Sequence, residues 1–176
     1  IIALFSLLAW WPLLVRFFRI FQWPEGTRTW LLAFCGWGAF LLVTATFTFL
    51  PGVLERWKFT NALVGHVHAA MGGMLTSFGM LILLTINPGP ALRGILGARA
   101  PFLFWHAGCL AHVVILTAAG MIESADPRWL YQSDASADLL YSLRLVAGLM
   151  MFMASAWWFG RMLASDFQRP SMRSAA

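Results

Sequence analysis

Charged residues are scarce in this sequence of 176 amino acids. Asp, Glu, Lys and Arg together make up 11% of the chain, whereas soluble globular proteins carry about 25% of these residues. The uncharged stretches 29–54, 59–92 and 100–122 are each longer than the roughly 20 residues that a membrane-spanning helix needs. With 60% hydrophobic residues, the composition excludes a water-soluble domain and predicts a polytopic membrane protein.

Cysteines and runs of basic residues are scarce too. The two cysteines, Cys35 and Cys109, lie inside uncharged stretches, which excludes a disulfide framework and a zinc-binding spacing. We expect both to be small buried apolar residues. The net charge of +5 comes from single basic residues beside apolar stretches, so it indicates membrane orientation and argues against nucleic-acid binding.

The chain also lacks the pattern of a signal peptide. It begins at the apolar Ile1 without an initiator Met, and Arg16 and Arg19 follow the first apolar stretch, whereas a signal peptide carries its basic residues before that stretch. We therefore expect a processed, truncated or incompletely observed N-terminus.

Apolar stretches of helical length predict an all-α fold, a polytopic membrane bundle with five transmembrane helices. The stretches show no alternation of polar and apolar residues, which excludes a β-barrel. No internal repeat or linker divides the chain, so residues 1–176 are expected to form a single membrane domain. The five spans are expected at about Ile1 to Phe21, Trp30 to Leu50, Phe59 to Ile86, Pro101 to Ile122 and Leu139 to Leu163.

The distribution of basic residues predicts the orientation of these spans. The side of the membrane with more Arg and Lys is normally cytoplasmic, so we expect an inner-membrane protein with its C-terminus in the cytoplasm and its N-terminus outside. The Trp residues recur near span ends and are expected to form an interfacial belt without chemistry. The external side holds Arg56, Lys58 and Arg128, and the cytoplasmic side holds Arg16, Arg19, Arg28, Arg93, Arg99, Arg161, Arg169 and Arg173.

Two histidines, His66 and His68, lie inside the third predicted span, on the order of 10 Å from the outer surface at a rise of about 1.5 Å per residue. An ionisable residue at this depth is costly and indicates a functional site. Successive helical residues rotate by about 100°, so the two imidazoles point from opposite faces and are poorly placed to bind one metal ion. They could each ligate a separate centre, or both could form hydrogen bonds in the bundle interior.

Small residues surround this histidine pair and keep the helix thin. They either let neighbouring helices approach closely or leave room for a flat macrocycle against each face, and both interpretations stay open. These residues are Gly65, Ala69, Ala70, Gly72, Gly73 and Gly79.

The segment Gly65-His66-Val67-His68 resembles the Gly-His-x-His motif of the tenth helix in the catalytic subunit of haem-copper oxidases, closest to the cbb-type cytochrome c oxidases and the bacterial nitric oxide reductases. Leu50-Pro51 resembles the Leu-Pro that precedes this helix in the reductases. Arg128-Trp129 resembles the loop after the eleventh helix of cbb-type oxidases, and residues 139–148 resemble the start of the last helix. The five predicted spans follow the order of the family's eighth to twelfth helices.

This resemblance implies roles for individual residues. His66 would be the proximal ligand of a high-spin haem, and His68 would ligate a low-spin haem, so that two haems of b type are expected. Arg128 would lie near haem propionates, although it could equally balance its own acidic loop. Arg144 would face the bundle or extend to the outer interface.

The resemblance is incomplete. The copper ligands of the family and the second axial ligand of its low-spin haem come from helices that precede the matched ones, so copper is expected from residues outside this chain. His106 and His112 match no family ligand position, and we expect them to form hydrogen bonds between helices, with an unrecognised site as the alternative.

The functional hypothesis is therefore a portion of a terminal oxidase that passes electrons from a low-spin haem to a high-spin haem, where dioxygen is reduced. Its expected partners are the remaining helices or subunits of the oxidase and a c-type cytochrome donor. Nitric oxide reduction is the alternative chemistry. The non-catalytic alternatives are a cut-down accessory subunit of a larger respiratory or photosynthetic membrane complex and an electron carrier with one haem.

Overall fold

The structure of the chain, a computed structural model, describes residues 2–87, 89–131 and 135–167, and within these ranges it contains helices and no strand. The long α-helices are α1 (Ile2–Ile20), α2 (Arg28–Thr48), α7 (Arg99–Ala125) and α8 (Ala135–Phe167). One further long helix is built from α4 (Asn61–His68), the π-helical η1 (Ala69–Leu75) and α5 (Thr76–Ile86). The short helices are α3 (Val53–Trp57), α6 (Pro90–Leu96) and the 3-10 helix η2 (Pro127–Tyr131).

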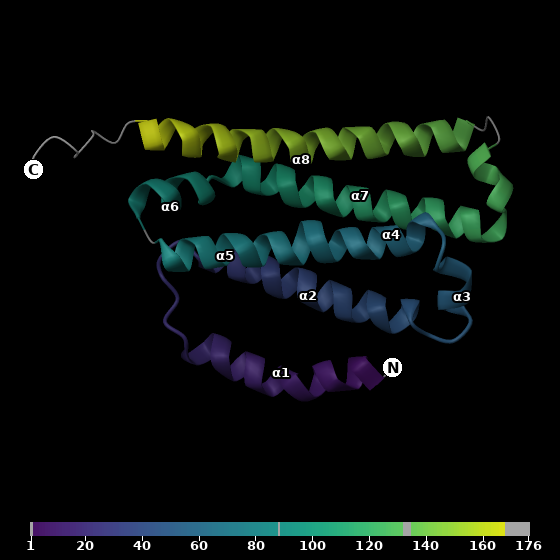
Figure 1. Cartoon of the computed structure of the whole chain (residues 1–176), viewed down its shortest axis with the longest axis horizontal. Helices are drawn as coiled ribbons and strands as arrows, with labels where there is room; N and C mark the ends of the chain where they lie inside the picture. The colour runs from purple at the N-terminus through teal and green to yellow at the C-terminus, as the bar shows by residue number, and fades with distance from the viewer. Residues whose placement is uncertain (1, 88, 132–134, 168–176) are drawn as a thin grey trace, which may run out of the picture.

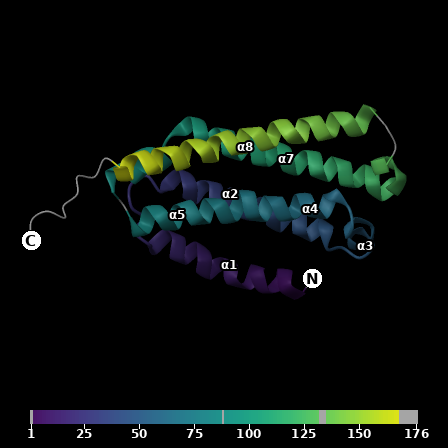
Figure 2. The ribbon, with the colours of Figure 1, turned by 45° about the horizontal axis from the view of Figure 1, so that its top comes forward.

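The long helices lie side by side in the order of the sequence (Figure 1). α4 packs on α7, α7 packs on α8, and η1 and α5 pack on α2. When the molecule is turned (Figure 2), α2 crosses the α4–α5 helix, and α1 and α8 remain at opposite edges of the arrangement. The expected all-α fold is therefore confirmed.

Four helical segments are long and apolar enough to cross a membrane, namely Arg28–Thr48, Asn61–Ile86, Arg99–Ala125 and Ala135–Ser165. The sequence predicted five, which is one too many for the described residues. α1 is helical where the first span was expected but is not among the four.

The two predicted groups of basic residues belong to opposite ends of the bundle. The C-terminus of α1, the N-terminus of α2 and α6 gather at one end, whereas α3 and η2 gather at the other (Figure 1). Successive connections between the long helices therefore lie at alternating ends of the bundle, as the division of the basic residues between two sides predicted. Arg169 and Arg173 lie outside the described residues.

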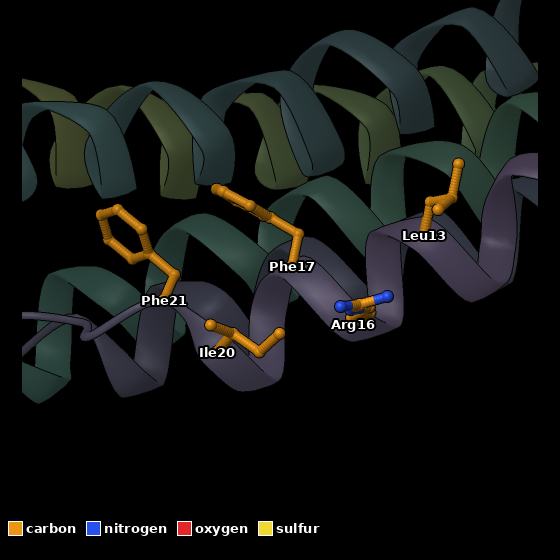
Figure 3. A pocket seen from close by; sticks show the side chains of 5 residues that line it. All are labelled: Leu13, Arg16, Phe17, Ile20 and Phe21. Carbon is orange, nitrogen blue, oxygen red and sulfur yellow. The ribbon is translucent and has the colours of Figure 1, made fainter.

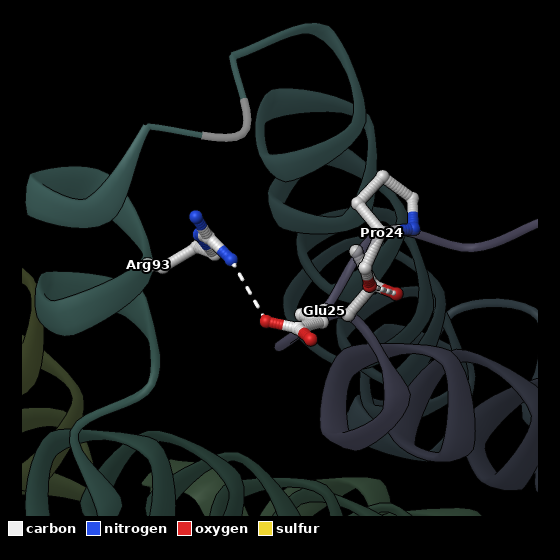
Figure 4. Close-up of polar contacts among 4 residues, drawn as sticks. Pro24, Glu25 and Arg93 are labelled. Atoms are coloured by element: carbon white, nitrogen blue, oxygen red, sulfur yellow. Dashed lines mark hydrogen bonds and ion pairs between the residues drawn. The ribbon is translucent and has the colours of Figure 1, made fainter.

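An ion pair ties the α1–α2 connection to α6. Nη1 of Arg93 lies 3.2 Å from Oε2 of Glu25 (Figure 4). The adjacent Gly26 has a φ of 85°, a left-handed conformation that side chains disfavour, and the stem of Arg93 packs over it. The exposed pair itself adds little stability, because water screens it.

Several tryptophans lie inside the bundle, contrary to the expected interfacial belt. Trp30 is fully buried and donates a hydrogen bond to the Leu96 carbonyl at 3.0 Å. Trp158 packs against Trp30, with ring centres 5.6 Å apart. Trp129 is buried and donates to Oγ of Ser136. Hydrogen bonds to α6 and α8 offset the cost of burying the indoles of Trp30 and Trp129. Trp158 is held inside by ring packing, and its Nε1 has no hydrogen-bond partner among the described residues.

Glycines set the distance between α4 and α7. A Cβ on Gly65 would lie 3.1 Å from the Val113 carbonyl oxygen, and a Cβ on Gly120 would overlap the backbone of Ala62. Of the two open interpretations of the small residues, close helix approach is therefore the one that applies at Gly65.

Glu123 extends this contact to the start of α4. Its carboxylate is buried and accepts hydrogen bonds from the backbone N–H of Asn61, at 2.7 Å, and from the Asn61 side-chain amide. A carboxylate at a helix N-terminus is favourable, because the first N–H groups lack partners within the helix. The fourth span was expected to end at Ile122, but α7 continues through Glu123 to Ala125.

Candidate functional site

His66 lies on α4 and faces α2. Its Nδ1 is 3.2 Å from Oγ1 of Thr44, and its ring packs edge-on against Phe49. The hydroxyl proton of Thr44 is already donated to the Phe40 carbonyl at 2.9 Å. With the hydroxyl donating to Phe40, the Thr44 oxygen is the acceptor for an Nδ1–H of His66.

A cavity of about 540 Å³ opens beside His66, between α1, α2 and the α4–η1 helix. This volume falls in the range of about 300–1,000 Å³ that is typical of cofactor and ligand sites. The walls are largely apolar, and small residues keep parts of them open. The lining residues are Leu14, Val15, Phe18, Arg19, Phe34, Cys35, Gly38, Leu41, Leu42, Ala45, His66, Ala70 and Met74.

His68 points to the opposite side, toward α7. Its Nδ1 lies 2.9 Å from the carbonyl oxygen of Val64, one turn back on the same helix. A carbonyl can only accept, so Nδ1 of His68 carries the proton. Its ring contacts the ring of His112 on α7, with centres 4.9 Å apart.

His66 and His68 therefore favour the same tautomer, although their rings lie on opposite faces of α4. In each neutral ring Nδ1–H is engaged by protein, which leaves Nε2 as the unprotonated nitrogen. This is the arrangement of an imidazole ligand, whose second nitrogen donates to a carbonyl or hydroxyl and fixes the ring. No hydrogen bond to Nε2 of either ring is found among the described residues. The side chains present thus fit a pair of axial ligands.

A π-helical segment, η1, follows His68 directly. Such segments are rare and frequently occur at functional sites. Three consecutive carbonyls of the segment receive side-chain donors, which stabilises the widened turn. They are the carbonyls of Met71, bonded to Oγ1 of Thr76 at 3.0 Å, of Gly72, bonded to Nε1 of Trp105 at 2.8 Å, and of Gly73, bonded to Oγ of Ser77 at 2.6 Å. Apart from its glycines, the segment has no feature from which a π-helix could be predicted.

His106 has the opposite protonation pattern. The indole Nε1 of Trp37, which can only donate, lies 2.9 Å from Nδ1 of His106. The proton of His106 is therefore on Nε2, a buried atom with no hydrogen-bond partner in the described part of the chain. The expected hydrogen bond between helices is confirmed for His106, because Trp37 belongs to α2 and His106 to α7.

Arg128 lies in η2, near the end of the bundle where α4 begins (Figure 1). Its backbone N–H donates to Oδ1 of Asp126 at 3.0 Å, and its Nε lies 3.3 Å from the same oxygen. These bonds lower the pKa of Asp126 below its ordinary value of 3.8. The guanidinium is largely exposed, so it balances its acidic loop and also remains accessible to another anion.

Arg144, on α8, is half-buried and lies beside His112 and Trp129. Arg144 was expected either to face the bundle or to extend to the outer interface, and in the structure it faces the bundle. Cys109 is buried as expected, whereas Cys35 is exposed and lines the cavity beside His66.

A second hollow, of about 310 Å³, lies on α1 alone. Leu13, Phe17, Ile20 and Phe21 form it together with Arg16 (Figure 3). No polar groups from other helices converge on it, so it is a weaker candidate site than the cavity at His66.

Within the described ranges, no group of three or more His, Cys, Asp or Glu side chains is placed to hold a metal ion. Comparisons with family models, with curated proteins and with solved structures give no match.

Proposed function

We propose that this chain is the haem-binding, C-terminal part of a haem-copper oxidoreductase catalytic subunit of the cbb-type oxidase and nitric oxide reductase branch. The observation that carries the proposal is the pair of imidazoles on opposite faces of α4, each with Nδ1 engaged by the protein and with no hydrogen bond to Nε2 among the described residues. His66 would hold a high-spin haem and His68 a low-spin haem. The sequence resemblance assigns these roles, and the protonation pattern supports them.

On the His66 side, the protein contributes orientation and a largely apolar space. Thr44 holds the imidazole by its Nδ1–H, and the hydroxyl of Thr44 is itself anchored to Phe40. The cavity beside the ring is large enough for a cofactor. Its apolar walls exclude water and strengthen electrostatic interactions inside it.

On the His68 side, the Val64 carbonyl keeps the imidazole in the ligand tautomer. The exposed guanidinium of Arg128 suits a carboxylate such as a haem propionate, with Asp126 as its partner in the absence of one. When bound, the two haems would supply the redox chemistry, in which electrons pass from the low-spin to the high-spin centre and dioxygen is reduced.

The remaining parts would come from partners. The copper ligands and the second axial ligand of the low-spin haem would belong to further helices or subunits, and a c-type cytochrome would donate electrons. The basic residues at one end of the bundle support a cytoplasmic C-terminus in a cell inner membrane. Nitric oxide is the alternative substrate. Oxidases and reductases differ at the copper site, and the helices that form that site precede the ones matched here.

A non-catalytic accessory subunit is the second candidate, favoured by the lack of a three-ligand metal group in the described ranges. The haem content of the purified complex distinguishes the oxidoreductase from the accessory subunit. The complex that contains this chain is purified intact, and its haem is measured by pyridine haemochrome in the wild type and in His66→Ala, His68→Ala and His106→Gln. His106→Gln is the matched control, since His106 lies in the same bundle but presents the other tautomer.

We expect the wild type and His106→Gln to hold the same haem, and each of the other variants to lose one haem per complex. An accessory subunit predicts the same content in all four proteins. If His66→Ala or His68→Ala does not assemble, the Gly variant at the same position with added imidazole replaces it, and recovery of the lost haem supports the assignment.

A further inference from the structure

An imidazole–imidazole contact joins α4 to α7. The ring centres of His68 and His112 are 4.9 Å apart, and the ring planes are inclined by 40°. His112 matches no family ligand position, and its Nδ1 is buried without a hydrogen-bond partner among the described residues. The ring does interact with the Arg144 backbone on α8, in line with the expected hydrogen bond between helices, but that interaction does not account for its contact with the ring of His68.

The backbone around the contact is closely packed. Gly65, one turn before His68, lies against the carbonyl of Val113, the residue after His112. The Cys109 thiol lies 3.9 Å from the backbone carbonyl oxygen of His68. The spacing of Cys109, His112 and Val113 places all three on the α4-facing side of α7. The two rings are thus held in contact by the register of their helices.

This distance excludes the two rings as ligands on opposite sides of one iron. With metal–nitrogen bonds of about 2.0 Å, the two nitrogens alone would be about 4 Å apart and the ring centres farther still. A cation shared between the rings is disfavoured by the charge of Arg144, which acts on His112. The ring contact makes His112 a neighbour that packs directly against His68.

We propose that His112 is a positioning residue that fixes the ring plane of His68. The inference rests on the proposed function, in which His68 is an axial ligand. The Val64 carbonyl holds one edge of the His68 ring, and the ring of His112 limits rotation about the Cβ–Cγ bond of His68. Groups that orient an axial ligand tune the electronic properties of its metal.

The test compares His112→Phe, which keeps a ring, with His112→Leu, which keeps an apolar side chain of similar length without a ring. Both are made in the intact complex. The readouts are the largest g value of the low-spin haem in electron paramagnetic resonance, its midpoint potential and the haem content. A role in packing alone would affect both variants equally, whereas ring positioning requires the aromatic side chain.

We expect His112→Phe to match the wild type and His112→Leu to shift both the g value and the potential. Loss of the low-spin haem in His112→Leu but not in His112→Phe would support the same role. Wild-type values in His112→Leu, or equal shifts in both variants, would overturn it. If His68→Ala retains the low-spin haem, the proposed function fails as well, so the two failures are distinguishable.

Discussion

The indole of Trp37 donates a hydrogen bond to Nδ1 of His106 across 2.9 Å, and this bond joins α2 to α7. Trp37 also packs against Gly73 of η1, so a single side chain contacts two neighbouring helices of the bundle. The position of η1, and with it the segment that follows His68, depends on this tryptophan.

Replacing Trp37 by Phe should destabilise the protein. The substitution removes the only donor that Nδ1 of His106 has among the described residues, and an unpaired buried acceptor costs about 1–3 kcal/mol. The free energy of unfolding in detergent micelles measures the effect. Trp10→Phe is the control, because Trp10 is 61% exposed, and equal stability of the two variants would contradict this role.

Gly120→Ala should disrupt the contact between α4 and α7. The new Cβ would overlap the backbone of Ala62, which can move only if the helices separate. Overpacking of this kind costs about 1–3 kcal/mol. Gly148→Ala, on α8, is the matched control because no atom lies within 4 Å of its Cβ position. Thermal unfolding should show a lower midpoint for Gly120→Ala and no loss for Gly148→Ala; a loss in both would argue against the packing explanation.

Glu123→Ala should weaken the start of α4. The variant leaves the Asn61 backbone N–H and side-chain amide without their carboxylate, in a buried position. Unpaired buried groups and the lost helix-terminus charge cost on the order of 1–3 kcal/mol. Hydrogen exchange at the amides of residues 61–64 should become faster. Ser124→Ala, with an exposed hydroxyl, should leave that exchange unchanged.

Acid should weaken the η2 turn. The pKa of Asp126 lies below 3.8 because the Arg128 backbone N–H and side chain bond the carboxylate. A lowered pKa in the folded state contributes stability that is present above the ordinary pKa and is lost as the pH falls through the folded value. In Arg128→Ala, an NMR titration should show the Asp126 pKa moving up only in part, because the backbone N–H remains. An unchanged value would mean that the guanidinium does not interact with Asp126.

The two-faced placement of His66 and His68 could be predicted from the sequence, because helical rotation is a local property that needs no tertiary information. Their partners could not be predicted. Thr44 and His112 reach them only through the register of α4 against α2 and α7, which close glycine contacts determine. The spacing of Cys109 and His112 is a weak signal that α7 presents His112 toward α4.

The other differences also arise from tertiary contacts. Trp30 and Trp158 lie near span ends in the sequence, as interfacial tryptophans do, yet packing of α2 against α6 and α8 buries them. Glu123 is charged and close to a turn, which indicates exposure. Its hydrogen bond from the Asn61 N–H, which has no partner within α4, retains it inside the bundle. The contacts that offset the burial of these side chains come from segments far apart in the sequence, so the local sequence does not reveal them.

The central claim is that His66 and His68 hold two different centres, and carbon monoxide tests it most directly. Carbon monoxide binds the reduced high-spin haem, whose sixth position is open, and not a six-coordinate low-spin haem. The carbon monoxide difference spectrum of the intact complex should disappear in His66→Ala and persist in His68→Ala. A spectrum that is unchanged in His66→Ala, or that is absent from the wild type, would contradict the account.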